Sequence, residues 1–376
     1  NHISSDSWPI YISLQKDGIL FKMRRTQDLP DKESATMFFQ DCKLTHQAQI
    51  TGISHSIKEI LPPDLLNLTQ LQKEANIRYG YTASEVYDIA QALYEKKLIS
   101  YPRTSSRYLT EDVFDSLSPI MARLLSWELF PAAKGTGGID ISSLSRHVIS
   151  AEKANVHHAI IITGIRPGNL SEKEMQVYRL VAGRMLETFM APCRIETTNV
   201  EAVCAAQHFK AEQTRIIEAG WHDVFMRSDM VPKSGYSVNE LPEVEKSDTL
   251  NVCGCNMVHK KQLPVNPFTD AELVEYMEQN GLGTVSSRTN IIRTLVNRKY
   301  IRYSGKYIVP TPKGMFTYET IRGKKIADTS LTADWEKQLA GLESGMITGQ
   351  DFLNRIRTLA KEMTDDIFNT YSTKEE

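Results

Sequence analysis

The sequence of 376 residues lacks any apolar run that approaches the roughly 20 residues needed to span a bilayer. It also lacks a secretory signal, since it opens with the polar stretch Asn1 to Asp6, and the missing initiator methionine indicates a fragment or a processed chain. Cysteine is scarce: five scattered residues, an odd number, are typical of a reducing compartment and not of a disulfide framework. The close pair Cys253 and Cys255 has no second pair at ligand spacing, so it does not indicate a metal site.

An excess of charge of one sign is missing as well, because the formal net charge is −2. The total therefore gives no support to nucleic-acid binding, but the distribution does. The basic segment, residues 284–325, carries ten cations against the single anion Glu319. These cations are Arg288, Arg293, Arg298, Lys299, Arg302, Lys306, Lys313, Arg322, Lys324 and Lys325. Two interpretations stay open, a solvated basic face and a surface that follows a phosphate backbone.

The first part of the chain has the alternation of β-strands, with an Asp-Gly hairpin signal at Lys16-Asp17-Gly18. From Leu65 to about Phe189 the apolar spacing is helical, and Thr82 to Glu85 and Ser171 to Glu174 have the pattern of capping boxes. Residues 195–263 are β-like again. A β region divided by a helical insertion predicts that the two β-like segments form one domain.

The last third is helical once more. The stretch FTDAELVEYMEQNGLGTVSSRTNIIRTLVNRKYIRYSGKYIVPTPKG predicts a helix, a glycine turn, a second helix and a hairpin through Ser304-Gly305. This order indicates a winged helix-turn-helix, usually a DNA-binding module. Residues 68–109 have a similar outline, in which a strand after the second helix carries Tyr101.

Tyr101 and Arg103 lie in KKLISYPRTSSRYL, residues 96–109. Alternation along a strand would put both side chains on one face. One interpretation is a strand that ends in a polar turn; the other is a tyrosine nucleophile followed by an arginine that holds the phosphate under attack. A phenol has an ordinary pKa of about 10, so such a site must favour proton loss and stabilise charge on the phosphate oxygens. An arginine fork suits the second task.

Four stretches resemble signatures of the type IA DNA topoisomerases, nearest to the topoisomerase III branch, and they follow the order of that family. They are LQKEANIRYGYTASEVYDIAQALYEKKLISYPRTSSRYL, NVHHAIIITG (155–164), FTDAELVEYMEQNGLGTVSSRTNIIRTLVNRKYI and LTADWEKQLAGLESG (331–345). The resemblance implies an enzyme that cleaves and reseals one DNA strand through a 5′-phosphotyrosine. Such an enzyme relaxes negative supercoils or unlinks DNA.

The resemblance also implies an α+β multidomain fold, the toroidal type IA core. A discontinuous β hinge domain would comprise residues 1–63 plus 197–265, a helical domain with the nucleophile residues 64–196, and a helical, winged-helix-like base domain residues 266–372. The partner implied is single-stranded DNA. The protein would be monomeric, free of membranes, cytoplasmic, nucleoid-associated and bacterial.

The resemblance implies three catalytic residues, Tyr101, Arg103 and His157. It implies five DNA-binding residues, Gln91, Glu95, Thr104, Ser287 and Arg298. Tyr101 would be the nucleophile, while Arg103 and His157 would hold the scissile phosphate. Magnesium is implied for the full-length enzyme, at a Toprim domain outside this chain. The chain itself has no Asp-x-Asp and is expected to hold no metal and to be inactive alone.

Two positions depart from the family pattern. Ser105 stands where the family has Asp, and Ile162 where it has Pro. Both alter local geometry without removing the nucleophile. The alternative function is a non-catalytic winged-helix DNA-binding protein, which the missing metal domain favours for this chain taken alone.

Overall fold

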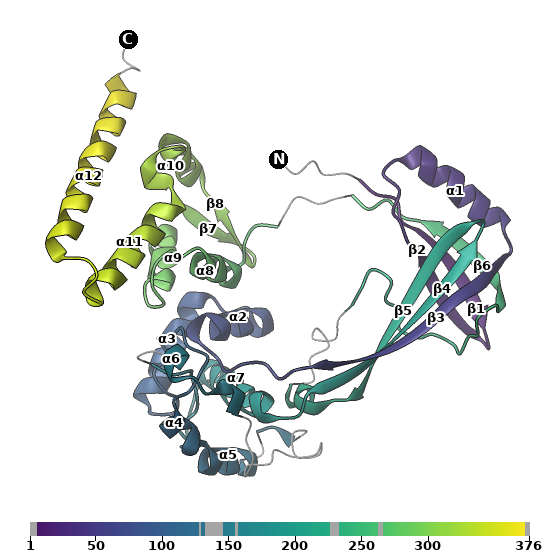
Figure 1. Ribbon diagram of the computed structural model, residues 1–376, viewed down its shortest axis with the longest axis horizontal. Helices are drawn as coiled ribbons and strands as arrows, with labels where there is room; N and C mark the ends of the chain where they lie inside the picture. The colour runs from purple at the N-terminus through teal and green to yellow at the C-terminus, as the bar shows by residue number, and fades with distance from the viewer. Residues whose placement is uncertain are drawn as a thin grey trace. The chain divides into compact units, whose positions relative to one another are not determined.

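The computed structural model divides the chain into two compact units (Figure 1). The barrel unit comprises residues 1–63, 128–144 and 186–266, and the helical unit comprises residues 64–127, 145–185 and 267–376. The structure describes residues 6–127, 129–131, 146–154, 157–225, 233–261 and 266–372. The division into three domains expected from the sequence stays a prediction.

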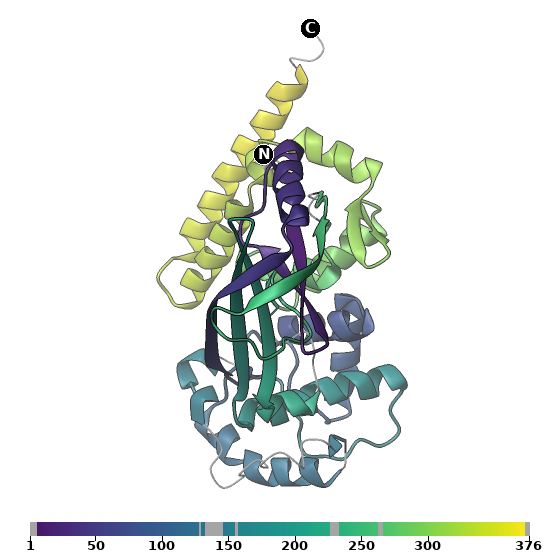
Figure 2. The same cartoon turned by 90° about the vertical axis from the view of Figure 1, so that its right-hand side faces the viewer.

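A closed barrel of antiparallel strands forms the core of the barrel unit. In spatial order its strands are β1 (Ile10–Lys16), β2 (Ile19–Arg25), β5 (Gln207–Glu218), β4 (Cys193–Cys204), β3 (Gln47–Ile60) and β6 (Thr249–Met257). Figure 2 shows the long strands β3, β4 and β5 side by side. Strands from both β-like segments of the sequence therefore belong to one sheet.

The predicted Asp-Gly hairpin joins β1 to β2. Asp17 and Gly18 both have positive φ, 50° and 81°, which is the backbone of the tight turn that favours this residue pair. The structure corrects the expectation that the first segment is entirely β-like, because helix α1 (Lys32–Leu44) follows β2. Asp31 begins this helix by accepting a hydrogen bond from the Ser34 amide at 2.7 Å.

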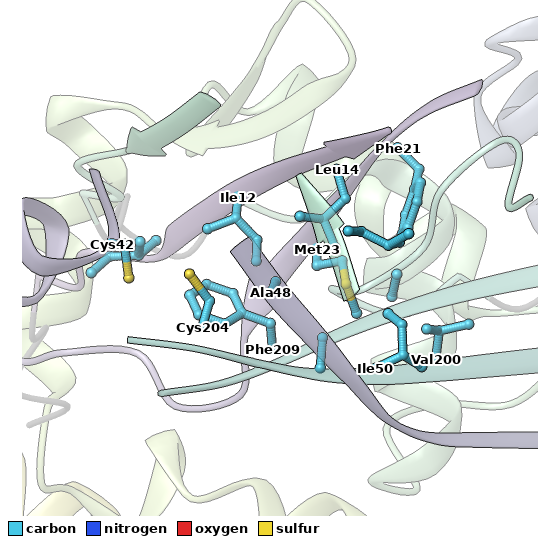
Figure 3. Close-up of a cluster of buried hydrophobic side chains, with 14 residues drawn as sticks. Ile12, Leu14, Phe21, Met23, Cys42, Ala48, Ile50, Val200, Cys204 and Phe209 are labelled. Carbon is cyan, nitrogen blue, oxygen red and sulfur yellow. The ribbon is translucent and has the colours of Figure 1, made fainter. Parts of the chain in front are cut away.

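Alternate residues of the strands fill the barrel. Ile10, Ile12 and Leu14 of β1 are fully buried, whereas their neighbours in the strand are more exposed. Figure 3 shows Ile12 and Leu14 in the same cluster of buried side chains as Phe209 of β5 and Cys42 of α1. The helix thus contributes to the same core that the strands enclose.

The helical unit is built from helices with short irregular connections. Its first elements are α2 (Leu68–Tyr79), α3 (Ala83–Glu95), α4 (Glu111–Asp115), α5 (Leu117–Ser126), the 3-10 turn Arg146–Val148, α6 (Ala151–Ala154) and α7 (Glu172–Phe189). The later ones are α8 (Asp270–Gln279), α9 (Arg288–Asn297), β7 (Ile301–Ser304), β8 (Tyr307–Pro310), α10 (Pro312–Ile321), the turn Lys325–Ala327, α11 (Thr329–Glu343) and α12 (Gly349–Ser372). Within the described ranges, no helix has the length and apolar character needed to cross a membrane.

The capping boxes predicted from the sequence are confirmed. Thr82 and Glu85 exchange side-chain and backbone hydrogen bonds at the start of α3, and a further capping box, Thr269 with Glu272, begins α8. The Ser171 hydroxyl accepts from the Glu174 amide at 3.3 Å, and the Glu174 carboxylate accepts from the Ser171 amide at 2.9 Å. The order helix, turn, helix, hairpin is also observed, in α8, α9, β7 and β8.

Candidate active site

The segment that carries Tyr101 is an extended loop and not the predicted strand. The Ser100 amide donates to the Ile161 carbonyl at 2.8 Å, yet residues 101–107 have no strand pairing. Pro102 has no amide proton and cannot continue a ladder, which gives a physical reason for the break. The expectation of a common strand face for Tyr101 and Arg103 is therefore wrong, and other contacts set their directions.

The Tyr101 ring packs against two other rings. The ring centroid of Tyr101 lies 4.4 Å from that of His157 and 5.4 Å from that of Tyr94, which it meets edge to face at 78°. Tyr101 is half-buried, whereas His157 is exposed. The structure thus brings together two of the three predicted catalytic side chains, with the imidazole open to a ligand.

The side chain of Arg103 packs against helix α3. Its guanidinium lies over the Tyr87 ring, 5.1 Å from the centroid, and its Nη2 donates to Gln91 Oε1 at 3.2 Å. Gln91 Nε2 in turn donates to Glu95 Oε1 at 2.9 Å. The Nε of Arg103 is buried and has no hydrogen-bond partner among the described residues. A buried, unpaired donor on a permanent cation is a position that an anion would satisfy.

One face of α3 organises both side chains. Tyr87, Gln91 and Tyr94 follow one another at helical spacing and contact Arg103 or Tyr101. The sequence analysis identified Gln91 but missed the two tyrosines. Their spacing from Gln91 was the available signal.

Thr104 connects the Tyr101 segment to the His157 segment. Its buried hydroxyl donates to the His157 carbonyl at 2.7 Å and accepts from the Ser106 amide at 3.0 Å. Its own carbonyl accepts from the Leu68 amide at 3.1 Å. These bonds use both functions of the hydroxyl inside the protein. Its expected DNA contact stays a prediction.

The two departures from the family pattern fit their surroundings. Ser105 is exposed, and its carbonyl accepts from Asn67 Nδ2 at 3.0 Å. Ile162 is fully buried, and its amide donates to the sulfur of Met185 at 3.2 Å. The Ile162 side chain therefore has a packed site, and its amide proton, which a proline would lack, has an acceptor.

Ser287 and Arg298 lie at the two ends of α9. Ser287 Oγ accepts from the Thr284 amide at 2.8 Å, and Arg298 is exposed with its carbonyl accepting from Lys313 Nζ at 2.9 Å. In the part of the chain that the structure describes, no hydrogen bond, ion pair or ring contact connects either residue to Tyr101. Their expected DNA contacts stay predictions.

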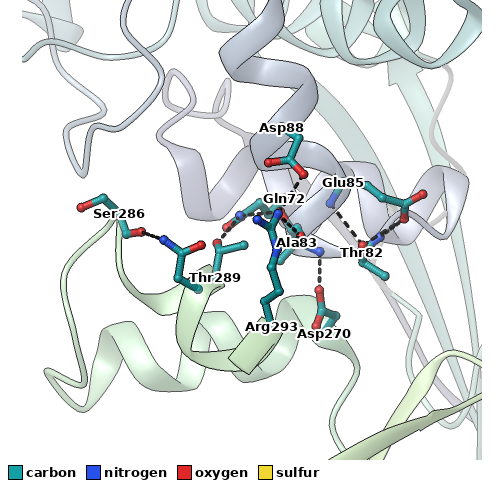
Figure 4. A network of polar contacts seen from close by, with 11 residues as sticks. Gln72, Thr82, Ala83, Glu85, Asp88, Asp270, Ser286, Thr289 and Arg293 are labelled. Carbon is teal, nitrogen blue, oxygen red and sulfur yellow. Dashed lines mark hydrogen bonds and ion pairs between the residues drawn. The ribbon is translucent and has the colours of Figure 1, made fainter. Parts of the chain in front are cut away.

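Polar contacts join α2 and α3 to α8 and α9 (Figure 4). Gln72 Nε2 donates to Thr289 Oγ1 at 3.0 Å, and Arg293 Nη2 donates to Asp88 Oδ2 at 2.8 Å. Lys73 and Glu275 form a further ion pair at 2.8 Å. The helix that carries the Tyr101 contacts is therefore fixed directly to the basic segment.

Asp270 lies at the centre of these contacts. It accepts hydrogen bonds from the Ala83 amide in the first turn of α3 and from the Tyr303 hydroxyl, the latter at 2.9 Å. Its side chain is buried, and burial raises the pKa of this carboxyl in spite of the two hydrogen bonds. The sequence analysis did not identify Asp270, since an aspartate in a first helical turn is expected to face solvent.

The residues around Tyr101 do not fit a magnesium ion by themselves. Among the described residues, no three histidine, cysteine, aspartate or glutamate side chains converge so that they could share a metal. Glu95, the carboxylate on the Gln91 face, is exposed and already accepts from Gln91. Magnesium needs several oxygen ligands in an octahedral arrangement, which this surface does not offer.

Comparisons with known proteins agree on one family. Residues 1–354 match the family model described as DNA topoisomerase. DNA topoisomerase 3 of Bacillus licheniformis is 31% identical over 344 residues, covering 85% of this chain and 47% of the relative. DNA topoisomerase 3 of Bacillus subtilis is 29% identical over 355 residues, covering 87% and 48%. The chain thus spans about half the length of these curated relatives.

A solved structure shows the same fold. Full-length topoisomerase I from Thermotoga maritima matches with a TM-score of 0.71 and 22% identity. The match covers 95% of this chain and 58% of that one.

Proposed function

This chain belongs to the DNA topoisomerase family, and we propose that it carries the nucleophile of a type IA enzyme that changes DNA topology by cutting and resealing one strand. The resemblance seen in the sequence signatures is confirmed by the family match, the relatives and the fold. Because the chain spans about half of those relatives, the activity is proposed for the whole protein, with magnesium as its cofactor.

The arrangement around Tyr101 carries the proposal. In the reaction, Tyr101 Oη attacks a backbone phosphorus, a bond forms between them, and the bond to the 3′ sugar oxygen breaks. The phenol loses its proton, the leaving oxygen gains one, and the 5′ phosphate stays on the tyrosine. Resealing is the same exchange in reverse, so no bond energy is lost to water.

Arg103 and His157 are suited to hold the phosphate. The imidazole of His157 packs at a tilt against Tyr101 and is exposed, so a phosphate oxygen can approach it while the phenol ring stays in contact. The Nε of Arg103 is unpaired but buried, so the guanidinium would turn from its place beside Gln91 to donate to a second oxygen. Donors held close to where charge develops lower the barrier.

Thr104 acts as a positioning residue in this scheme. Its hydroxyl holds the His157 backbone to the Tyr101 segment at 2.7 Å, so the distance between nucleophile and imidazole is set by a short local connection. Gln91 similarly orients Arg103. Both roles depend on helix α3 and the loop being held together.

The basic segment supports a DNA-binding role. Arg298, Lys299 and Arg302 are exposed at the end of α9 and on β7, and they have no acidic partner among the described residues. We propose that α8, α9, β7 and β8 form a winged-helix module that contacts single-stranded DNA through these cations.

Tyr101→Phe tests the nucleophile. In the full-length parent protein we expect the variant to form no covalent DNA adduct while it retains DNA binding, because only the attacking oxygen is removed. Denaturing gels after incubation with labelled single-stranded DNA and magnesium measure the adduct. Tyr94→Phe is the matched control, since it keeps the ring contact with Tyr101 and should keep the adduct.

An adduct formed by Tyr101→Phe would place the nucleophile elsewhere. DNA binding by the wild-type protein with no adduct under any condition would instead favour the non-catalytic alternative. The two outcomes are separated by comparing adduct yield and binding in the same samples.

A further inference from the structure

Three thiols meet in the barrel unit. Cys42 lies in the last turn of α1, Cys204 at the end of β4 and Cys255 in β6. Cys42 and Cys204 belong to the buried core, and Figure 3 shows their sulfur atoms turned toward one another. Cys255 is half-buried against the same core, and the Cys42 thiol is within hydrogen-bonding reach of both others.

A bulge in β6 brings Cys255 into this cluster. Leu250 and Val252 face the core, so strict alternation would put Cys255 outside. The register with β1 shifts at Cys253, which has no partner residue on β1. The shift leaves Cys253 exposed and turns Cys255 inward, although the two are only two positions apart.

The three thiols affect one another's pKa, because Cys42 interacts with both Cys204 and Cys255. The bond with Cys42 lowers the pKa of the Cys255 thiol, with burial opposing it. The pKa of Cys42 is raised to about 11 even though the bond with Cys204 lowers it. The pKa of Cys204 is also raised, by its bond to Cys42 and by burial.

We propose that this cluster is a modification site for hydrogen peroxide, in which Cys255 is oxidised first and Cys42 then closes a disulfide with it. The Cys255 thiolate attacks one peroxide oxygen, the O–O bond breaks, and the leaving oxygen departs as water after taking a proton. The Cys42 sulfur then attacks the Cys255 sulfenic acid and displaces its oxygen as a second water. Two thiols and one hydrogen peroxide thus yield one disulfide and two waters.

Access and contact select this pair. Cys255 is half-exposed and can meet the oxidant, whereas Cys42 and Cys204 are fully buried. Cys42 has a side-chain interaction with Cys255 and lies in a helix that packs on β6, so it is placed to resolve the sulfenic acid before Cys204. The sulfurs must approach to about 2 Å, which requires the last turn of α1 to move.

The disulfide would tie α1 to β6. These two elements are distant in the sequence and already pack together in the barrel unit. A crosslink between distant positions restricts the unfolded chain and stabilises the fold. Oxidation is therefore expected to raise the melting temperature of the barrel, and a thiol reductant should reverse the change.

The test treats the purified 376-residue chain with a few equivalents of hydrogen peroxide. Intact mass without reductant should fall by about 2 Da for the two hydrogens lost, and peptide mapping should recover Cys42 joined to Cys255. In Cys42→Ser, Cys255 should stop at the sulfenic acid, a gain of about 16 Da that a sulfenic-acid probe captures. The matched control, Cys253→Ser, should behave as wild type.

Peptide mapping of the wild-type chain tests the proposal even if a cysteine variant fails to fold. Three results would overturn the proposal: no crosslink, a crosslink between Cys42 and Cys204, or oxidation confined to the exposed Cys253. A native alkylation assay gives a second measurement. The alkylating reagent should modify Cys255 faster than its partial burial alone would allow. Alkylation of Cys253 alone would count against the proposed site.

Discussion

Replacing Thr104 with valine should separate cleavage from DNA binding. The substitution keeps the shape of the side chain and removes only the hydroxyl. Thr104 is 3% exposed, and its hydroxyl makes two hydrogen bonds, to the His157 carbonyl at 2.7 Å and from the Ser106 amide at 3.0 Å. The first bond holds the segment of His157 against that of Tyr101, and the second fixes the Tyr101 segment locally.

The expected loss of stability follows from these two bonds. His157 is exposed, so its carbonyl can turn to water, and losing that bond costs about 1 kcal/mol. Ser106 is buried, and its unpaired amide costs about 1–3 kcal/mol. We therefore expect the free energy of unfolding to fall by about 2–4 kcal/mol. A shift of His157 by about 1 Å would slow cleavage roughly 100-fold.

Thr104→Ser is the matched control, since it keeps the hydroxyl and loses one methyl group, worth about 1 kcal/mol. Urea unfolding measures the stability of the chain, and single-turnover adduct formation in the full-length protein measures cleavage. DNA binding should stay within a few-fold of wild type in both variants. Equal adduct rates for the valine and serine variants would refute the positioning role of the hydroxyl.

Three further predictions concern other parts of the chain. Arg298→Ala should weaken single-strand binding and reduce the slope of log affinity against log salt concentration by about 0.7–1, which corresponds to one phosphate contact. Arg322 is already paired with Glu319 at 3.5 Å, so Arg322→Ala should leave this slope nearly unchanged. Equal slopes for the two variants would contradict the assignment. Burial raises the pKa of Asp270, so between pH 3.8 and that raised value the folded state binds more protons than the unfolded state. The free energy of unfolding, relative to that of Asp270→Asn, should therefore fall as pH rises through this window. A difference in urea unfolding that stays constant with pH would contradict the prediction. Residues 1–376 alone should bind single-stranded DNA weakly and fail to relax supercoiled plasmid with or without magnesium. The reason is that no acidic cluster that fits the ion lies among the described residues. Relaxation that Tyr101→Phe abolishes would instead show that the chain holds a complete site.

Local signals in the sequence predicted local structure well. The Asp17-Gly18 turn and the capping boxes depend on a few adjacent residues, and the structure has them as expected. Helix α1 was missed because its apolar stripe is thin: Ala35 and Cys42 are its buried residues. Its start did carry a signal, since Asp31 follows Pro30 and caps the Ser34 amide.

The candidate site could be predicted in identity but not in geometry. The signatures predicted Tyr101, Arg103 and His157 as site residues. In the structure the rings of Tyr101 and His157 are in contact, although the two residues are far apart in the sequence. Alternation predicted a shared strand face for Tyr101 and Arg103, but α3 sets both directions through its aromatic face. Side-chain contacts made by the preceding helix override the period of a short segment.

The basic segment shows why a count of charges misjudges a binding surface. Several of its ten cations form ion pairs, and two of them, Arg288 and Arg293, pair with Glu278 and Asp88 of other helices, at 3.5 and 2.8 Å. Asp88 lies far upstream in α3, so no window of the sequence could reveal that pair. Such cations hold helices together, and they release few counterions when DNA binds. The cations left exposed at the end of α9 and on β7 are therefore the ones that should set the salt dependence, well below the value that ten phosphate contacts would give.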